Sequence, residues 1–165
     1  RQLPLNVLSI DGTTVVRDGN GTILDEVTCP GANVNSGTAD SLDTSAVAKV
    51  VLAERHTPAL RGALRAWSAD DLISSQLMAT ELLRLAARLG IPPAVAATAA
   101  STFELIDVER EDFIAASSMA PPLARTLDVL HVAVAARVGA DVIVTYDQRQ
   151  AEVASAAGLE VAAPD

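Results

Sequence analysis

The chain has 165 residues, of which half are hydrophobic and only 2% aromatic, and its formal net charge is −9. This length suits one domain with a modest appendage. No apolar stretch reaches the roughly 18 residues of a membrane span, no signal peptide is visible, and Cys29 has no partner, so we expect a cytoplasmic protein. The negative charge opposes binding to nucleic-acid phosphates unless clustered carboxylates hold a cation.

The N-terminal part differs in texture from the rest. Residues 13–17 and 22–27 are β-prone and flank Asp18-Gly19-Asn20-Gly21, which favours a hairpin. Residues 29–38, rich in glycine, asparagine and serine, are typical of a linker. Because an isolated hairpin is marginal in water, this segment must dock, pair with another chain or remain loosely ordered. We therefore divide the chain into an N-terminal extension, 1–38, and a domain, 39–165.

Strand and helix patterns alternate along the domain. The predicted helices cover 44–53, 58–67, 76–89, 93–102, 111–118, 123–138 and 148–157. The first strand is expected to end at Leu42-Asp43, and further strands are expected at 71–75, 104–108, 141–145 and 159–162. Gly90, Gly139 and Gly158 follow helices that they can terminate. The alternation predicts an α/β fold with a mainly parallel sheet covered by helices on both faces.

Four acidic residues stand where this pattern favours apolar or small ones. Asp43 and Asp147 follow predicted strands, Glu81 shares the leucine face of its helix, and Asp128 lies in an apolar helix. In parallel α/β sheets, ligand sites gather beyond the carboxyl ends of the strands. Several carboxylates facing an apolar interior repel one another, and a hard divalent cation such as Mg²⁺ relieves both the repulsion and the burial. The four acids therefore indicate a metal site.

Each acid also has a purely structural interpretation. Asp43 and Asp147 could cap the helices that follow them, while Asp128 and Glu81 could form ion pairs with arginines about one turn away. The arginines within reach are Arg125 for Asp128, and Arg84 and Arg88 for Glu81. The joint pattern of four such acids in one α/β chain favours the functional interpretation.

Three strings in this order, LDTSAVAK at 42–49, RTLDVLHVA at 125–133 and TYD at 145–147, resemble a VapC-type PIN domain from about residue 41 to 164. The resemblance implies a three-layer α/β/α sandwich preceded by the hairpin-like or disordered extension. It also implies a ribonuclease toxin that uses Mg²⁺ or Mn²⁺, hydrolyses RNA with a metal-activated water to leave a 5′-phosphate, and is silenced by a VapB-type antitoxin. An inactive PIN-like binding or assembly module is the alternative.

The resemblance also implies roles for individual residues. The first to fourth acids of the family correspond to Asp43, Glu81, Asp128 and Asp147, with Asp43 and Asp128 as the main metal ligands. The expected supporting residues are polar neighbours and a candidate phosphate contact: Thr44, Ser45, Thr145 and Arg125.

Other polar residues are expected to take no part in the chemistry. In the family that this chain resembles, the position of His131 packs beside the helix without reacting. Ser74 and Ser75 have no histidine at a suggestive place in the sequence, which argues against a Ser–His–Asp triad. Trp67 is expected to anchor the core or a dimer face, and the alanine-rich helices make a homodimer plausible.

Overall fold

A computed structural model of the chain describes residues 6–10, 13–17, 23–28, 39–52, 55–67, 72–122 and 124–165, with side chains described from residue 39 onwards. The strands of the domain are β4 (Asp40–Leu42), β5 (Leu72–Ser75), β6 (Glu104–Ile106), β7 (Val142–Val144) and β8 (Glu160–Ala162). The helices are α1 (Thr44–Leu52), α2 (Thr57–Ala66), α3 (Gln76–Leu89), α4 (Pro93–Ala100), α5 (Arg110–Ala116), α6 (Thr126–Arg137) and α7 (Gln148–Ala156). These elements follow the predicted order.

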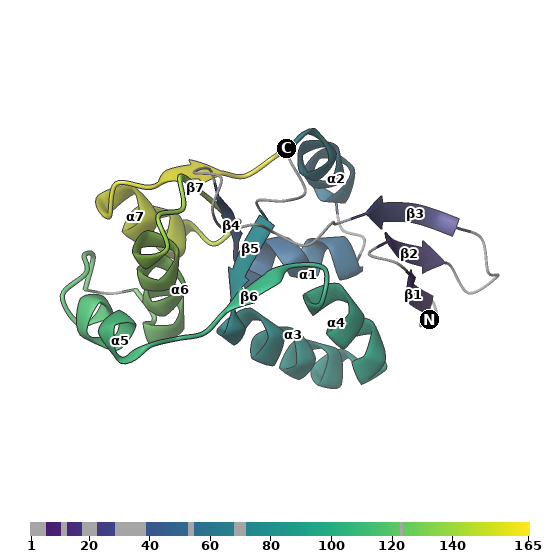
Figure 1. Cartoon of the computed structure of the whole chain (residues 1–165), viewed down its shortest axis with the longest axis horizontal. Helices are drawn as coiled ribbons and strands as arrows, with labels where there is room; N and C mark the ends of the chain where they lie inside the picture. Colours follow the sequence, from purple (N-terminus) through teal and green to yellow (C-terminus); the bar gives the residue numbers. More distant parts are fainter. Residues whose placement is uncertain are drawn as a thin grey trace.

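The five strands form one parallel sheet in the order β6-β5-β4-β7-β8, which puts β4 at the centre (Figure 1). In its register Leu42 lies opposite Val144, and Ser41 lies opposite Ile73. Parallel neighbours need crossover connections, and the helices provide them. The prediction of a parallel sheet is confirmed, and the carboxyl ends of β4, β5 and β7 lie side by side.

Successive strand residues face opposite helix layers, as the period of two requires. Leu42, Leu72 and Val144 belong to the core that the sheet shares with α1–α4. Ile143 packs with residues of α6 and α7, and Ile73 packs with residues of α6, on the other face. Figure 1 shows α6 and α7 on one side of the sheet and α1, α3 and α4 on the other. The predicted three-layer sandwich is confirmed.

The buried face of α3 differs from the predicted one. The helix packs through Met78, Leu82 and Ala86, whereas Leu89 is 46% exposed. Glu81 lies beside this stripe, on the half-buried row that it shares with Leu77 and Leu85, which agrees with the expectation that it points inward or to the edge of a cleft. The helix ends as predicted, at Gly90 in the left-handed conformation with φ of 68°.

The N-terminal strands β1 (Asn6–Ile10), β2 (Thr13–Arg17) and β3 (Ile23–Thr28) form a separate antiparallel sheet (Figure 1). The predicted hairpin is confirmed as β2 and β3. Sequence reasoning missed β1, which pairs with β2 and lies beside α4. The predicted linker, 29–38, lies outside the described residues.

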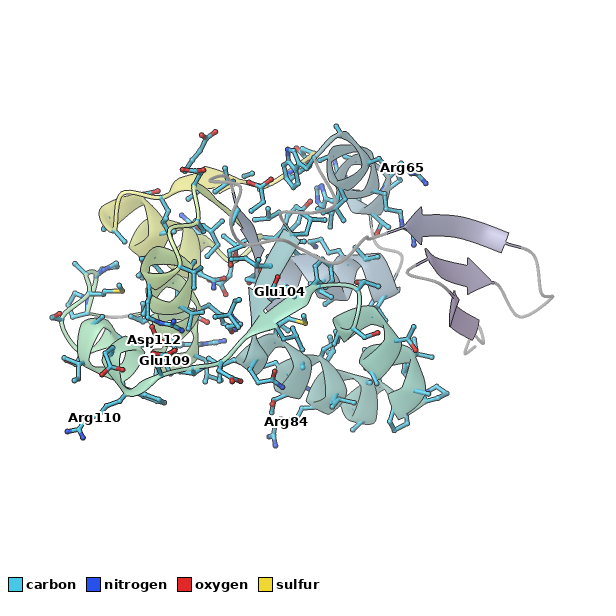
Figure 2. The ribbon with its side chains drawn as sticks, in the orientation of Figure 1. Arg65, Arg84, Glu104, Glu109, Arg110 and Asp112 are labelled. Carbon is cyan, nitrogen blue, oxygen red and sulfur yellow. The ribbon has the colours of Figure 1, made fainter. Side chains whose placement is uncertain are left out.

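An ionic cluster joins α5 to the end of α6. Arg137 donates to Asp112 through Nε (2.8 Å to Oδ1) and Nη2 (3.2 Å to Oδ2), and to the Asp107 carbonyl at 2.8 Å. Asp112 is only 1% exposed and also accepts from the Glu109 backbone in a capping box. Figure 2 shows Asp112 and Glu109 on the α5 side of this contact. The cluster fixes α5 against the body of the domain.

Two further expectations concern surfaces. Trp67 is half-buried and packs against the main core, which agrees with its predicted role as a core anchor. Within the described part of the chain, no helix is long and apolar enough to cross a membrane.

Candidate active site

Asp43 is the first residue after the central strand β4, and it is only 5% exposed. Its Oδ1 accepts hydrogen bonds from the Ser45 hydroxyl at 2.8 Å and from the Ala46 backbone N–H at 2.9 Å. The side chain therefore caps α1, as the structural interpretation predicted. Burial raises the pKa of Asp43, and these hydrogen bonds offset only part of that rise.

The end of β7 is tied to the start of α1 by hydroxyl groups. The Ser45 hydroxyl accepts from the Tyr146 backbone N–H at 2.8 Å. Thr145, which is 1% exposed, donates to Oε1 of Gln150 at 2.8 Å and accepts from the Asp147 backbone at 3.1 Å. Ser45 and Thr145 thus hold the loops that carry the first and fourth acids, and their supporting roles in the chemistry stay a prediction.

Asp147 begins α7. Its Oδ1 accepts from the backbone N–H groups of Arg149 at 2.8 Å and Gln150 at 3.3 Å. The predicted cap is confirmed. The side chain is half-buried beyond the carboxyl end of β7, and its Oδ2 takes no part in these two hydrogen bonds.

Asp128 lies in the first turn of α6, where the helix dipole favours a negative charge. Its Oδ2 is buried and has no hydrogen-bond partner in the part of the chain that the structure describes. Burial raises the pKa of Asp128, and the negative charges of Asp147 and Glu81 add to the rise, while Arg125 opposes it. Arg125 itself is exposed and precedes the helix. The third acid is therefore a poorly satisfied carboxylate close to two others.

Glu81 reaches from α3 towards α1 and α6. Its Oε2 accepts from the Thr44 hydroxyl at 2.5 Å and lies 3.0 Å from Nε2 of His131. Burial alone would raise the pKa of Glu81, but the hydrogen bonds with His131 and Thr44 outweigh it and lower the pKa. Histidine thus takes the place that the sequence had offered to Arg84 or Arg88.

His131 and Ser75 are the residues that sequence reasoning missed. His131 is 5% exposed, and its Nδ1 lies 2.8 Å from the Ser75 hydroxyl at the end of β5. The sequence alone did not predict a histidine partner for Ser75, because 56 residues separate the two. They meet only because α6 packs against β5. The signal that could have revealed this contact is the pair of serines directly after the apolar residues of a buried strand.

The predicted residues meet in one region, but they do not form a tight cage. Charge interactions link Asp128 to Asp147 and Glu81, and hydrogen bonds link Thr44 to Glu81 and Ser45 to Asp43. Among the described residues, no three acidic, histidine or cysteine side chains form a group that could hold a metal ion as they stand. The convergence of all four acids on one ion stays a prediction.

The donor set nevertheless fits a hard divalent cation. All the candidate ligands are carboxylate oxygens, and one of them, Oδ2 of Asp128, is buried without a partner. Mg²⁺ commonly binds through one or two carboxylates and keeps several of its waters, so it does not need a preformed cage of three protein groups. Asp43 and Asp128 each carry the type of ligand that this smaller requirement calls for, and their joint binding of a cation stays a prediction.

Comparison with known sequences places the chain in a protein family. Residues 41–156 match the PIN domain. The chain is 33% identical over 126 residues to "Ribonuclease VapC46" of Mycobacterium tuberculosis, an alignment that covers 74% of this chain and 95% of that protein.

Solved structures share the fold at lower identity. "Toxin-antitoxin complex from Klebsiella pneumoniae" contains a chain that matches with a TM-score of 0.61 at 16% identity, covering 77% of this chain and 98% of that one. "Crystal structure of Mycobacterium tuberculosis VapC20", described as a "Sarcin-Ricin loop cleaving toxin", matches with a TM-score of 0.59 at 19% identity, covering 73% of this chain and 96% of that one.

Proposed function

This chain belongs to the PIN-domain family and is a relative of the VapC ribonucleases, and from that premise we propose that it is an endoribonuclease toxin. Its reaction is the hydrolysis of an RNA phosphodiester by water, which leaves a 5′-phosphate. Residues 39–165 form the catalytic domain, and residues 1–38 form an extension outside it. The site of action is the cytoplasm, where the RNA substrate is.

One observation carries the proposal: Asp128 has a buried oxygen without a partner beside two other negative charges. Such a group is expensive in a purely structural role, because a buried unsatisfied carboxylate loses its hydration without compensation. A divalent cation would remove that cost. PIN-domain nucleases generally need a divalent metal ion, and we propose Mg²⁺, with Mn²⁺ as a substitute, on the strength of the all-oxygen donor set.

The residues divide the work as follows. Asp43 and Asp128 would hold the cation, with Asp43 fixed by Ser45 and Ala46. Glu81 and Asp147 would orient waters around it, and exposed Arg125 would contact a phosphate of the RNA. When bound, the cation supplies a water of lowered pKa and neutralises charge on the phosphoryl oxygens.

Such an activity requires control, and we propose a VapB-type antitoxin as the partner. The solved neighbour from Klebsiella pneumoniae is a toxin–antitoxin complex, which supports this assignment. Induced expression of the chain should arrest bacterial growth, and co-expression of the cognate antitoxin should restore it. The expected homodimer stays a prediction that light scattering can test.

The direct test is cleavage of total RNA with mapped ends, in Mg²⁺ and in EDTA. The wild type should cleave in Mg²⁺ and leave 5′-phosphates, while Asp43→Asn and Asp128→Asn should lose at least about 100-fold in rate, since each removes a ligand that stabilises transition-state charge. Asp141→Asn is the matched control, because this exposed acid lies at the opposite end of the sheet, just before β7. Equal cleavage by wild type in EDTA and in Mg²⁺ would refute the proposal.

A second function, an inactive binding or assembly module, is favoured by one observation. No three of the described acids form a metal-holding group as they stand. Calorimetric titration with Mg²⁺ separates the two functions: an inactive module binds no ion that depends on Asp43, whereas the nuclease binds one that Asp43→Asn removes.

A further inference from the structure

A series of hydrogen bonds leads from Glu81 into the core, and two of its members, Ser75 and His131, have no role in the proposed reaction. It joins Ser75 at the end of β5, His131 in the middle of α6, Glu81 on α3 and Thr44 at the start of α1. Ser75 and His131 are 2% and 5% exposed. These hydrogen bonds therefore connect the sheet and three helices, with a buried end at Ser75 and His131 and a half-buried end at Glu81 and Thr44.

The donors to Glu81 follow from the chemistry of its carboxylate. The ionised Glu81 carboxylate can only accept, so both neighbours of its Oε2 must donate: the Thr44 hydroxyl at 2.5 Å and Nε2–H of His131 at 3.0 Å. The Ser75 hydroxyl, which can donate or accept, lies 2.8 Å from Nδ1 and anchors the other side of the ring.

We propose that His131 is a positioning residue, whose imidazole is anchored by Ser75 at Nδ1 and fixes Glu81 for the metal site through Nε2–H. Oε2 of Glu81 is occupied by Thr44 and His131, so Oε1 is the oxygen left for the cation or its waters. Hydrogen-bonded partners behind metal ligands commonly govern ligand orientation and metal affinity. This inference rests on the proposed function, because it assigns His131 a task within that same site.

The order serine, histidine, acid also resembles a nucleophilic triad, but its burial excludes that reaction. Ser75 is 2% exposed and lies between the end of β5 and the start of α3, so a polynucleotide phosphate cannot approach its hydroxyl. The series of hydrogen bonds leads from Ser75, its buried end, to Glu81, which lies at the candidate site.

The first test measures Mn²⁺ affinity by electron paramagnetic resonance and cleavage by kcat and KM. His131→Leu and His131→Asn should bind Mn²⁺ about 10- to 100-fold more weakly and lose kcat similarly, with the KM for RNA nearly unchanged. Asparagine is too short to reach Glu81, although it can still meet Ser75. His131→Gln places an amide N–H near the position of Nε2 and should recover most of the affinity.

Val132→Ala is the control for packing, because this neighbour on α6 is fully buried and has no polar group. It should lower the thermal midpoint and leave Mn²⁺ affinity unchanged. Mn²⁺ affinity at the wild-type level in His131→Leu, or an equal loss of affinity in Val132→Ala, would overturn the assignment. If the leucine variant does not fold, the comparison of His131→Gln with His131→Asn decides the question.

The second test needs neither metal nor activity. Nitrogen-15 NMR of the imidazoles in the metal-free protein should show a proton on Nε2 of His131, and Ser75→Ala should shift the Nδ1 resonance. A ring with its only proton on Nδ1 would overturn the proposal. A wild-type protein that shows the Nε2–H form and yet cleaves no RNA would instead refute the proposed function, so the two failures remain distinct.

Discussion

Replacing Asp43 with asparagine should have opposite effects on stability without and with the metal. Asparagine has nearly the same shape, and its Oδ1 can still accept from Ser45 and Ala46. What the variant loses is the charge of a carboxylate that is only 5% exposed. Burial raises the pKa of this group despite its hydrogen bonds, so the charged form is disfavoured in the folded protein.

The magnitude follows from two opposing contributions. Hydrogen bonds to a charged acceptor are worth roughly 1 kcal/mol more each than those to a neutral one, so asparagine loses about 2 kcal/mol over its two bonds. Removing a buried charge recovers the desolvation penalty of several kcal/mol. The metal-free variant should therefore be about 1–2 kcal/mol more stable than the wild type. A cation at 100 times its Kd adds about 2.7 kcal/mol to the wild type and nothing to a variant that cannot bind it.

The order of stability should thus reverse between EDTA and saturating Mg²⁺. Urea unfolding of wild type, Asp43→Asn and the control Asp141→Asn in both buffers measures the reversal. Asp141→Asn should gain as much from Mg²⁺ as the wild type does. If Asp43→Asn is less stable than the wild type in EDTA, or gains as much from Mg²⁺, the reasoning about this site is wrong.

Three further predictions concern pH, the ionic cluster and the core. The stability advantage of metal-free Asp43→Asn should shrink as pH falls through the raised pKa of Asp43. It should vanish below 3.8, the pKa of Asp43 in the unfolded chain, because both side chains are then neutral in both states. Urea titrations across this pH range measure the change. Arg137→Met should cost about 3 kcal/mol in urea unfolding, because Asp112 is left buried and uncompensated, and adding Asp112→Asn should recover part of that loss. Leu60→Ala, at a fully buried position of α2 away from the acids, should cost about 2–5 kcal/mol and leave kcat within about twofold, which unfolding and cleavage assays measure together.

The sequence predicted much of the fold because its signals are local. Alternation of strand and helix patterns in 141–162 sufficed for the parallel unit of β7, α7 and β8, which the structure confirms. The end of α3 at Gly90 follows from one residue's backbone freedom. Cap positions were equally readable, since Asp43 and Asp147 bond to the first turns of their own helices.

The pairing of side chains across the sheet was beyond such reasoning. The sequence offered Glu81 an arginine on its own helix, because the periodicity of a helix can only be read within that helix. The structure gives it His131 and Thr44, which lie 50 and 37 residues away. These partners depend on which strands are neighbours and on how α3 is rotated about Met78 and Leu82.

The types of residue and their places in the elements were therefore determined by the sequence alone: carboxylates just after two strands, in the first turn of one helix and within another helix, in an order that belongs to one family. Which oxygen Glu81 keeps free was decided only by the tertiary structure. Hydrogen bonds between distant elements have angular and distance requirements that strand order and helix rotation set, and these arise from packing of the whole domain rather than from any local run of residues.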